Sequence, residues 1–259
     1  MGAVLILFCI PFTKTQLEIL ILMKTFSRII IISITDLTLI LRDKSLLLLL
    51  FVPFLILLVL QLLVPFLTGF VPVLPEYYTL IVALTAVVSS LFPGFIMAFI
   101  ILDEKEQYLT DVFKVLPWSI NSLLMVRIAL SSLTGFIYSL IILTFSGLYE
   151  FTNPQIIYTS VLNAFASPIM AILVLIFSQN KIEGVVYTKV FNFILMLPVA
   201  SFFINEFWRY AFGLIPNFWS FELLFSNNSY HLLFIIGLLI NLTCVSVIYR
   251  ILARKLRQV

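Results

Sequence analysis

The sequence predicts an all-α membrane protein with six transmembrane helices, and its composition and apolar pattern point to this fold class. Hydrophobic residues make up 63% of the 259 residues and charged residues only 10%, whereas soluble domains carry roughly 25% charged residues. The apolar runs are long and lack the alternation of barrel strands, so the chain should cross the bilayer as helices. At about 20 residues per span, six helices use nearly the whole length. We therefore expect one transmembrane domain over residues 1–259.

The distribution of basic residues predicts the orientation of these spans. Fourteen of the fifteen Lys and Arg residues fall on one side of the six-span topology, and only Arg209 falls on the other. Because basic loops stay in the cytoplasm, both chain ends are expected there. These residues lie at span ends, where they contact anionic membrane lipid, so we expect no nucleic acid partner.

The first part of the chain contains one interfacial helix and two spans. Residues 1–12 lack a basic n-region and a small-residue cleavage site, so they make a poor signal peptide; an interfacial tail, or a true start at Met23, fits better. Residues 24–41 repeat apolar side chains at helical spacing with polar residues between them, which predicts an amphipathic helix in the cytoplasmic interface. The first span should cover 45–67 and the second 78–102.

Four further spans follow. The third is expected at 120–147, the fourth at 155–178 with a kink at Pro168, the fifth at 185–204 and the sixth at 231–251. Between the last two, residues 205–230 hold many aromatic side chains around Pro216. Such a segment is typical of headgroup depth, and we expect a re-entrant pair of short helices on the external side.

Small residues recur at helical spacing in two spans. They are Ala86, Ser90, Gly94 and Ala98 in the second span and Ser131, Gly135 and Ser139 in the third. Small side chains let neighbouring helices approach closely. Two interpretations remain open: a tight seam between two chains, or ordinary helix packing within one subunit.

Few residues could support catalysis or hold a cofactor. Cys9 and Cys244 are isolated, and with the single His231 they cannot assemble a metal cluster. None of the eight glycines belongs to a G-x-x-x-x-G-K-[ST] loop, so we expect no bound cofactor and no nucleotide hydrolysis in this chain. An enzyme acting on lipid or polyprenyl carriers remains an alternative. It would need a polar catalytic cluster at one interface, and the only external candidates for such a cluster are Glu206, Arg209 and Glu222.

The cytoplasmic segment 103–117 has the pattern of a short amphipathic helix. Apolar residues from Leu109 onward share one face, opposite Glu104 and Glu106, and the helix should stop before Pro117. Such a helix could dock in a groove of another protein. A solvated loop that terminates a span explains the same charges equally well.

Two motifs resemble ABC-2 type transporter permeases. The first consists of Asp103-Glu104-Lys105-Glu106, Thr110, Leu116-Pro117-Trp118-Ser119 and Arg127, and it resembles the E-K-E-x-G-T…L…[ST]-P-L-S…K signature after the second helix. The second consists of Ser178-Gln179-Asn180-Lys181-Ile182-Glu183-Gly184, Leu197-Pro198 and Ile215-Pro216-Asn217-Phe218-Trp219, and it is similar to the N-K-x-E-G…K…P…[LI]-P-x-x-W stretch of fluoroquinolone and multidrug export permeases. One departure is Tyr108, which stands where the family usually has glycine.

The resemblance implies an exporter permease that pairs with a cytoplasmic ABC ATP-binding subunit and with a second permease chain, as a homodimer or heterodimer. Residues 24–41 would be the connecting helix, 103–117 the coupling helix and 205–230 an external hairpin over the pathway. The substrate would be amphipathic: a drug, a peptide or a lipid-like molecule. A non-transporting immunity or structural membrane protein remains a further alternative. By similarity, the ATPase contact would involve Glu104, Glu106, Thr110 and Pro117.

Overall fold

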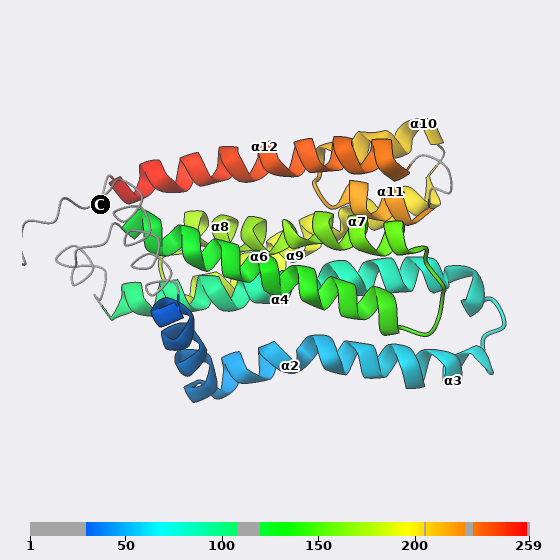
Figure 1. Ribbon diagram of the computed structural model, residues 1–259, viewed down its shortest axis with the longest axis horizontal. Helices are drawn as coiled ribbons and strands as arrows, with labels where there is room; N and C mark the ends of the chain where they lie inside the picture. The colour runs from blue at the N-terminus through cyan, green and yellow to red at the C-terminus, as the bar shows by residue number, and fades with distance from the viewer. Residues whose placement is uncertain (1–29, 108–119, 205, 226–229, 258–259) are drawn as a thin grey trace, which may run out of the picture.

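The computed structural model describes residues 30–107, 120–204, 206–225 and 230–257, and these ranges form a helical bundle without strands. Six segments are long and apolar enough to cross a membrane, and they run side by side along the long axis (Figure 1). The predicted all-α architecture with six spans is confirmed. The orientation of the bundle in the membrane stays a prediction.

The first two spans follow a helix that crosses the bundle at a steep angle. Residues 30–42 are helical and carry the described part of the predicted interfacial helix (Figure 1); residues 24–29 lie outside the described residues. Asp43 caps the next helix by accepting hydrogen bonds from the amides of Ser45 and Leu46. The first span comprises α2 (Lys44–Leu58), the π-helical turn η1 (Val59–Leu63) and α3 (Val64–Thr68), and the second comprises η2 (Leu74–Tyr77) and α4 (Tyr78–Glu106).

The third span is α6 (Ile120–Phe145), and the fourth is broken into α7 (Asn153–Ala164) and α8 (Ala166–Phe177). The break has a local cause, because Pro168 has no N–H to donate to the carbonyl of Ala164. The Ser132 hydroxyl of α6 donates to that carbonyl instead, at 2.9 Å. A neighbouring helix thus satisfies the group that the proline leaves free.

The remaining elements are α9 (Lys181–Met196), η3 (Leu197–Phe203), α10 (Glu206–Arg209), η4 (Tyr210–Leu214), α11 (Phe218–Phe225) and α12 (Tyr230–Arg257). Three predicted boundaries were wrong. Helix α4 continues to Glu106 rather than ending at Leu102, α9 begins at Lys181 rather than at Val185, and α12 continues to Arg257 rather than ending at Ile251. The early start has a clear cause, because the Asn180 side chain accepts from the Glu183 amide at 2.8 Å and caps α9.

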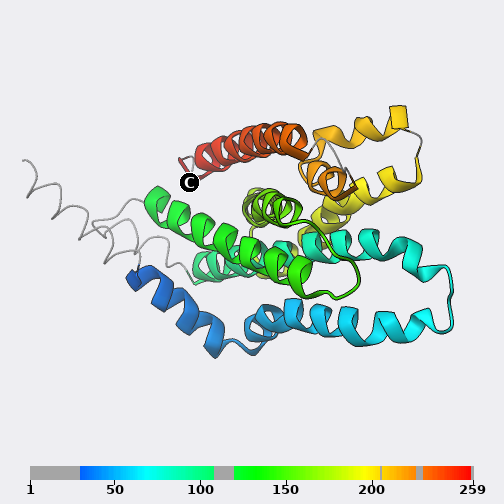
Figure 2. The same ribbon diagram turned by 45° about the vertical axis from the view of Figure 1, so that its right-hand side comes forward.

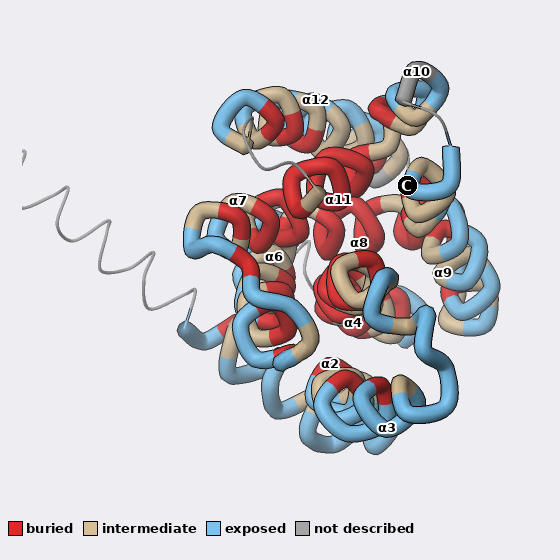
Figure 3. The backbone as a smooth tube through the Cα atoms, turned by 90° about the vertical axis from the view of Figure 1, so that its right-hand side faces the viewer, coloured by how far each residue is buried: buried red, intermediate tan, exposed pale blue. Residues whose placement is uncertain are grey.

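Helices α4 and α8 form the centre of the bundle, and α2 lies at its edge. Seen end-on, α4, α8 and α11 are buried on most sides, whereas α2, α3 and the outer faces of α9 and α12 are exposed (Figure 3). The exposed faces are rich in large apolar side chains such as Phe51, Leu62, Phe193 and Leu239. An apolar exposed face on a long helix is the surface that lipid covers.

The predicted small residues lie at close contacts between helices. A Cβ atom on Gly94 of α4 would lie 2.0 Å from the carbonyl oxygen of Ser167 on α8. On α6, a Cβ atom on Gly135 would lie 3.0 Å from the carbonyl oxygen of Ser90 and 3.2 Å from the Ser167 Cβ atom. These contacts lie within one subunit, where only glycine permits the observed approach. The other predicted small residues are also buried: Ala86, Ala98, Ser131 and Ser139.

The segment between the fifth and sixth spans folds back into the bundle. Helix α11 packs against the start of α12 (Figure 2), and α10 contacts η3 and η4. At the turn between α10 and α11, the Trp219 indole donates to the Gly213 carbonyl at 2.8 Å, and the Asn217 amide donates to the Leu195 carbonyl of α9 at 3.2 Å. The Asn241 amide of α12 donates to the Pro216 carbonyl at 3.4 Å. Side-chain amides and an indole thus donate hydrogen bonds to backbone carbonyls that have no hydrogen-bond partner within a regular helix.

Candidate functional site

A buried arginine lies between two carboxylates at one end of the bundle, where α4, α8 and α12 finish and α6 and α9 begin. We call this the basic end. Arg127 of α6 donates to Asp36 of the 30–42 helix through Nε (3.0 Å to Oδ2) and Nη2 (2.7 Å to Oδ1). It donates to Glu104 of α4 through Nη1 (2.5 Å to Oε2) and Nη2 (2.6 Å to Oε1). Four of its five N–H donors are therefore used, in two bidentate pairs.

The Asp36–Arg127–Glu104 triad is nearly sealed from solvent. The exposed fractions are 4% for Asp36, 3% for Arg127 and 9% for Glu104. Burying charged groups away from water has a large free-energy cost, so buried charges are stable only when each is paired and hydrogen-bonded. The triad therefore fixes the 30–42 helix, α4 and α6 to one another in one arrangement.

A second set of contacts joins the end of α4 to the start of α9. The Lys181 ammonium lies 2.7 Å from Asp103 Oδ1, and the Lys181 amide donates to Glu106 Oε1 at 2.6 Å. The absent Cβ of Gly184 allows this approach, since a methyl group there would lie 2.8 Å from Leu102 Cδ1. The two sequence motifs, 103–106 and 178–184, thus meet in space.

The four predicted ATPase-contact residues do not share one environment. Glu104 is buried in the triad, and Glu106 is exposed but holds the Lys181 amide. Thr110 and Pro117 lie outside the described residues. The ATPase contact therefore stays a prediction. The described part of the predicted coupling segment is the end of α4 and Gln107.

Sequence reasoning missed the roles of three residues. It treated Arg127 and Lys181 as basic residues that set topology and as members of the two family motifs, and it counted Asp36 only among the polar residues of the interfacial helix 24–41. A signal for Arg127 did exist, because it lies one turn or more inside an apolar span, where a charge requires a partner. The sequence Asn180-Lys181-Ile182-Glu183 is also a helix-start signature that places Lys181 at the first turn of α9.

The opposite end of the bundle pairs two of the residues named for a lipid enzyme. Arg209 and Glu222 form an ion pair, and the Glu222 side chain is buried within α11; the Glu206 side chain lies outside the described residues. Among the described residues no group of three or more His, Cys, Asp or Glu side chains could hold a metal ion. At this end the charges of Arg209 and Glu222 therefore contact each other.

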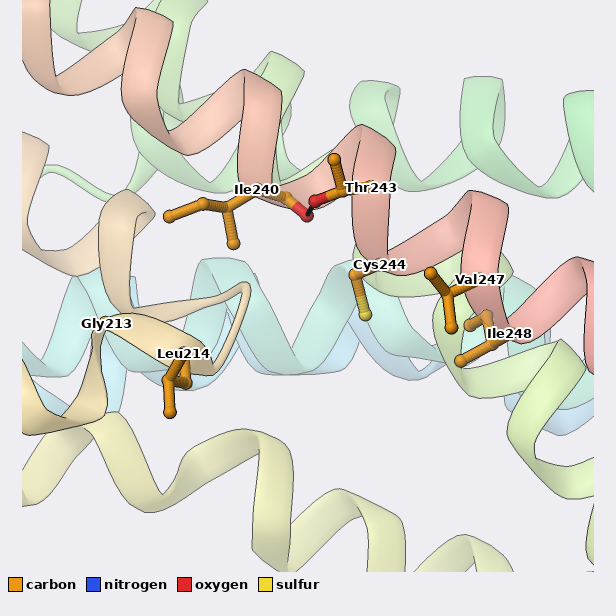
Figure 4. A pocket seen from close by; sticks show the side chains of 7 residues that line it. All are labelled: Gly213, Leu214, Ile240, Thr243, Cys244, Val247 and Ile248. Carbon is orange, nitrogen blue, oxygen red and sulfur yellow. Dashed lines mark hydrogen bonds between the residues drawn. The ribbon is translucent and has the colours of Figure 1, made fainter.

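Two hollows open on the sides of the bundle. One, of about 350 Å³, lies between η4 and α12, and its apolar wall includes Leu214, Ile240 and Val247 (Figure 4). The Thr243 hydroxyl there donates to the Ile240 carbonyl of its own helix at 2.8 Å. The other hollow, of about 600 Å³, lies at the basic end between α2 and α9 with α4 as its floor. Its lining includes Lys44, Leu48, Phe95, Phe99, Lys181 and Val185.

Comparison with known proteins places this geometry in a family. Two relatives from Mycobacterium tuberculosis, the Fluoroquinolones export permease proteins MT2760 (strain CDC 1551 / Oshkosh) and Rv2686c (strain H37Rv), are each 25% identical over 147 residues. The alignment covers 56% of this chain and 58% of each relative, so the chain spans less than two thirds of their length. No solved structure matches.

Residues 36–249 match the family described as Fluoroquinolones export permease protein Rv2686c-like. The matched range begins at the Asp36 carboxylate and contains all three members of the triad, both motifs at the basic end and nearly all of the six spans. With six apolar helices of spanning length, the chain is a multi-pass cell membrane protein, and it belongs to the Rv2686c-like family of fluoroquinolone export permeases.

Proposed function

We propose that this chain is the membrane-spanning subunit of an ABC-2 type exporter, which moves amphipathic compounds across the cytoplasmic membrane. A separate cytoplasmic subunit binds and hydrolyses ATP. The relatives' names support export of fluoroquinolones, which are amphipathic drugs. A second permease chain completes the pathway.

The observation that carries this proposal is the connectivity of the basic end. The segment predicted to contact the ATPase follows Gln107 in the sequence, and the last turn of α4 just before it is linked to three other elements. Glu104 reaches α6 and, through Arg127, the 30–42 helix, while Asp103 and Glu106 reach α9 through Lys181. A displacement of the segment after Gln107 would therefore move four helices together rather than one loop.

Bidentate pairs suit such transmission because they resist both sliding and rotation. Each carboxylate of the triad accepts two parallel N–H bonds from one planar guanidinium, a geometry that fixes distance and orientation together. When one member of such a tightly packed, hydrogen-bonded triad moves, the other members move with it.

The test is site-specific cross-linking to an ATP-binding subunit encoded beside this chain. In a background without Cys9 and Cys244, Thr110→Cys should cross-link to that subunit, and the yield should change on adding a non-hydrolysable ATP analogue. The matched control is Glu150→Cys, which lies exposed at the opposite end of the bundle and should give no cross-link. Fluoroquinolone accumulation in cells that express both subunits supplies the second measurement.

Two results would overturn the proposal. One is equal cross-linking at Thr110→Cys and Glu150→Cys, which would remove the ATPase from the basic end. The other is drug accumulation that does not fall when both subunits are expressed and that does not respond to inactivation of the ATPase.

A further inference from the structure

The groove between α2 and α9 has the chemistry of a binding site for a small amphipathic acid. We propose that this groove binds a drug-sized aromatic carboxylic acid, which enters from the lipid-facing side near the basic end of the bundle. The proposal rests on the exporter function above and deepens it by naming where such a compound binds and which groups hold its carboxylate.

The floor and walls of the groove suit a flat apolar body. Phe95 and Phe99 of α4 form the floor, with ring centroids 4.2 Å apart and ring planes tilted by 47°, so a planar ring can stack on one of the two. Leu48 on the α2 side is 64% exposed, and Val185 on the α9 side is 39% exposed. Aromatic rings flanked by aliphatic side chains offer a planar ring both a stacking surface and an apolar cover.

The charged groups of the groove favour an anionic head. The Lys44 side chain on one wall is exposed and makes no ion pair or hydrogen bond with the part of the chain that the structure describes. Lys181 on the other wall holds Asp103, but both side chains of that pair are about one third exposed, so the ammonium can also reach a ligand. Asp43 also lines the groove, and its Oδ1 atom caps α2. The lining therefore holds two ammonium groups and one carboxylate, so its net charge is positive and an anionic head can lie between the two ammonium groups.

The size of the groove decides between two kinds of anionic amphiphile. A hollow of about 600 Å³ lies within the range of roughly 300–1,000 Å³ that is typical of sites for drug-sized ligands. The groove can enclose a compact ring system together with its carboxylate, whereas it could hold only a small part of a phospholipid, whose two acyl chains would stay in the bilayer. The match in size and the aromatic floor therefore favour the compact ring system.

The experiment measures binding without transport. The full chain is placed in nanodiscs of zwitterionic lipid, without any ATP-binding subunit, and titrated with ciprofloxacin, a fluorescent aromatic carboxylic acid. We expect saturable binding that Lys44→Gln weakens about tenfold, because a hydrogen bond between two charged groups is lost. Phe99→Ala should weaken binding through loss of the ring contact. Arg254→Gln removes an exposed charge at the same end of the bundle and should leave the affinity unchanged.

The head group is tested with the methyl ester of the same drug. The ester should bind weakly, and its affinity should not respond to Lys44→Gln. Equal affinity of the wild type and Lys44→Gln for the acid would overturn the site, as would equal binding of acid and ester. Displacement of the drug by a modest fraction of phosphatidylglycerol in the nanodisc would also overturn it, since the groove would then be a lipid site.

Failure of the site and failure of the exporter function give different results. If the complex exports the drug in an ATP-dependent way but binding does not depend on Lys44, the proposed site is wrong and the exporter function stands. If binding depends on Lys44 but the chain exports nothing with any ATP-binding subunit, the site stands and the exporter function is wrong.

Discussion

Replacement of Arg127 by Met should destabilise the protein far more than loss of either carboxylate that it binds. With all three groups ionised, the triad carries one positive and two negative charges. Arg127→Met leaves Asp36 and Glu104 facing each other, almost sealed from water, without a cation. Breaking a buried ion pair in this way costs about 3–5 kcal/mol. In contrast, Glu104→Gln leaves a neutral Arg127–Asp36 pair with both of its bonds and costs about 1–3 kcal/mol.

The assay is thermal unfolding of the purified protein in detergent, followed by tryptophan fluorescence. For a chain of this size, Arg127→Met should lower Tm by on the order of 10 °C, and Glu104→Gln should lower it by less than half as much. Arg254→Met is the matched control, because the same change at an exposed position of α12 should move stability by no more than about 0.5 kcal/mol.

A triple replacement tests whether the cost comes from unpaired charge. Converting Asp36 to Leu, Glu104 to Met and Arg127 to Met removes all three charges together, and apolar replacements of a buried ion set are often neutral or stabilising. The triple variant should therefore recover most of the Tm that Arg127→Met loses. The reasoning is refuted if Glu104→Gln is as damaging as Arg127→Met, or if the triple variant is the least stable of the series.

Three further predictions concern packing, the re-entrant hairpin and orientation. Gly94→Ala should prevent normal packing of α4 on α8 and cost more than about 3 kcal/mol, because its Cβ atom would lie 2.0 Å from a backbone oxygen; Gly69→Ala, whose nearest contact would be 3.4 Å, should leave Tm unchanged. Trp219→Phe removes the donor to the Gly213 carbonyl and should cost about 1–3 kcal/mol, with faster proteolysis between α10 and α11; unchanged cleavage would contradict the role of this bond. Glu150→Cys should react in intact cells with a membrane-impermeant maleimide, and labelling only after lysis would reverse the predicted topology.

The positions of the spans could be predicted because hydropathy is a local property. Runs of apolar residues predicted the positions of all six spans, and the small-residue pattern includes Gly94 and Gly135, which lie at close contacts between helices. Boundaries failed where polar residues continue a helix. Helix α4 extends to Glu106 because the carboxylates of its last turn have partners on other helices, which a search for apolar runs ignores.

The triad could not be predicted, because it joins residues that are far apart in the sequence. Asp36 lies 91 residues from Arg127, and Glu104 lies 23 residues from it. Helical periodicity says which residues of one helix share a face, but it does not say which face of another helix lies opposite. Asp36 therefore looked like part of a solvated polar face, although it is 4% exposed.

The acidic cluster at the end of α4 shows how one turn of helix can hold several neighbours. Residues three apart lie on the same side of a helix, whereas the next residue in sequence points about 100° away. Asp103 and Glu106 accordingly both reach Lys181 of α9, and Glu104 turns toward Arg127 of α6. The carboxylates at the end of α4, which the sequence pattern places on one charged face, therefore contact two different residues of the same chain, Lys181 and Arg127.

This division changes where an ATPase contact should be sought. A carboxylate with two bonds to Arg127 cannot also bind another protein without giving up those bonds, which would leave two N–H donors of the buried guanidinium unsatisfied, at a cost of about 1–3 kcal/mol. Glu104 is therefore better suited to position the end of α4 than to contact a partner. The residues that contact the ATPase should follow Gln107, where Thr110 lies. Replacement of Glu104 by Lys would abolish ATPase binding indirectly, by breaking the triad, so only variants beyond Gln107 can separate contact from positioning.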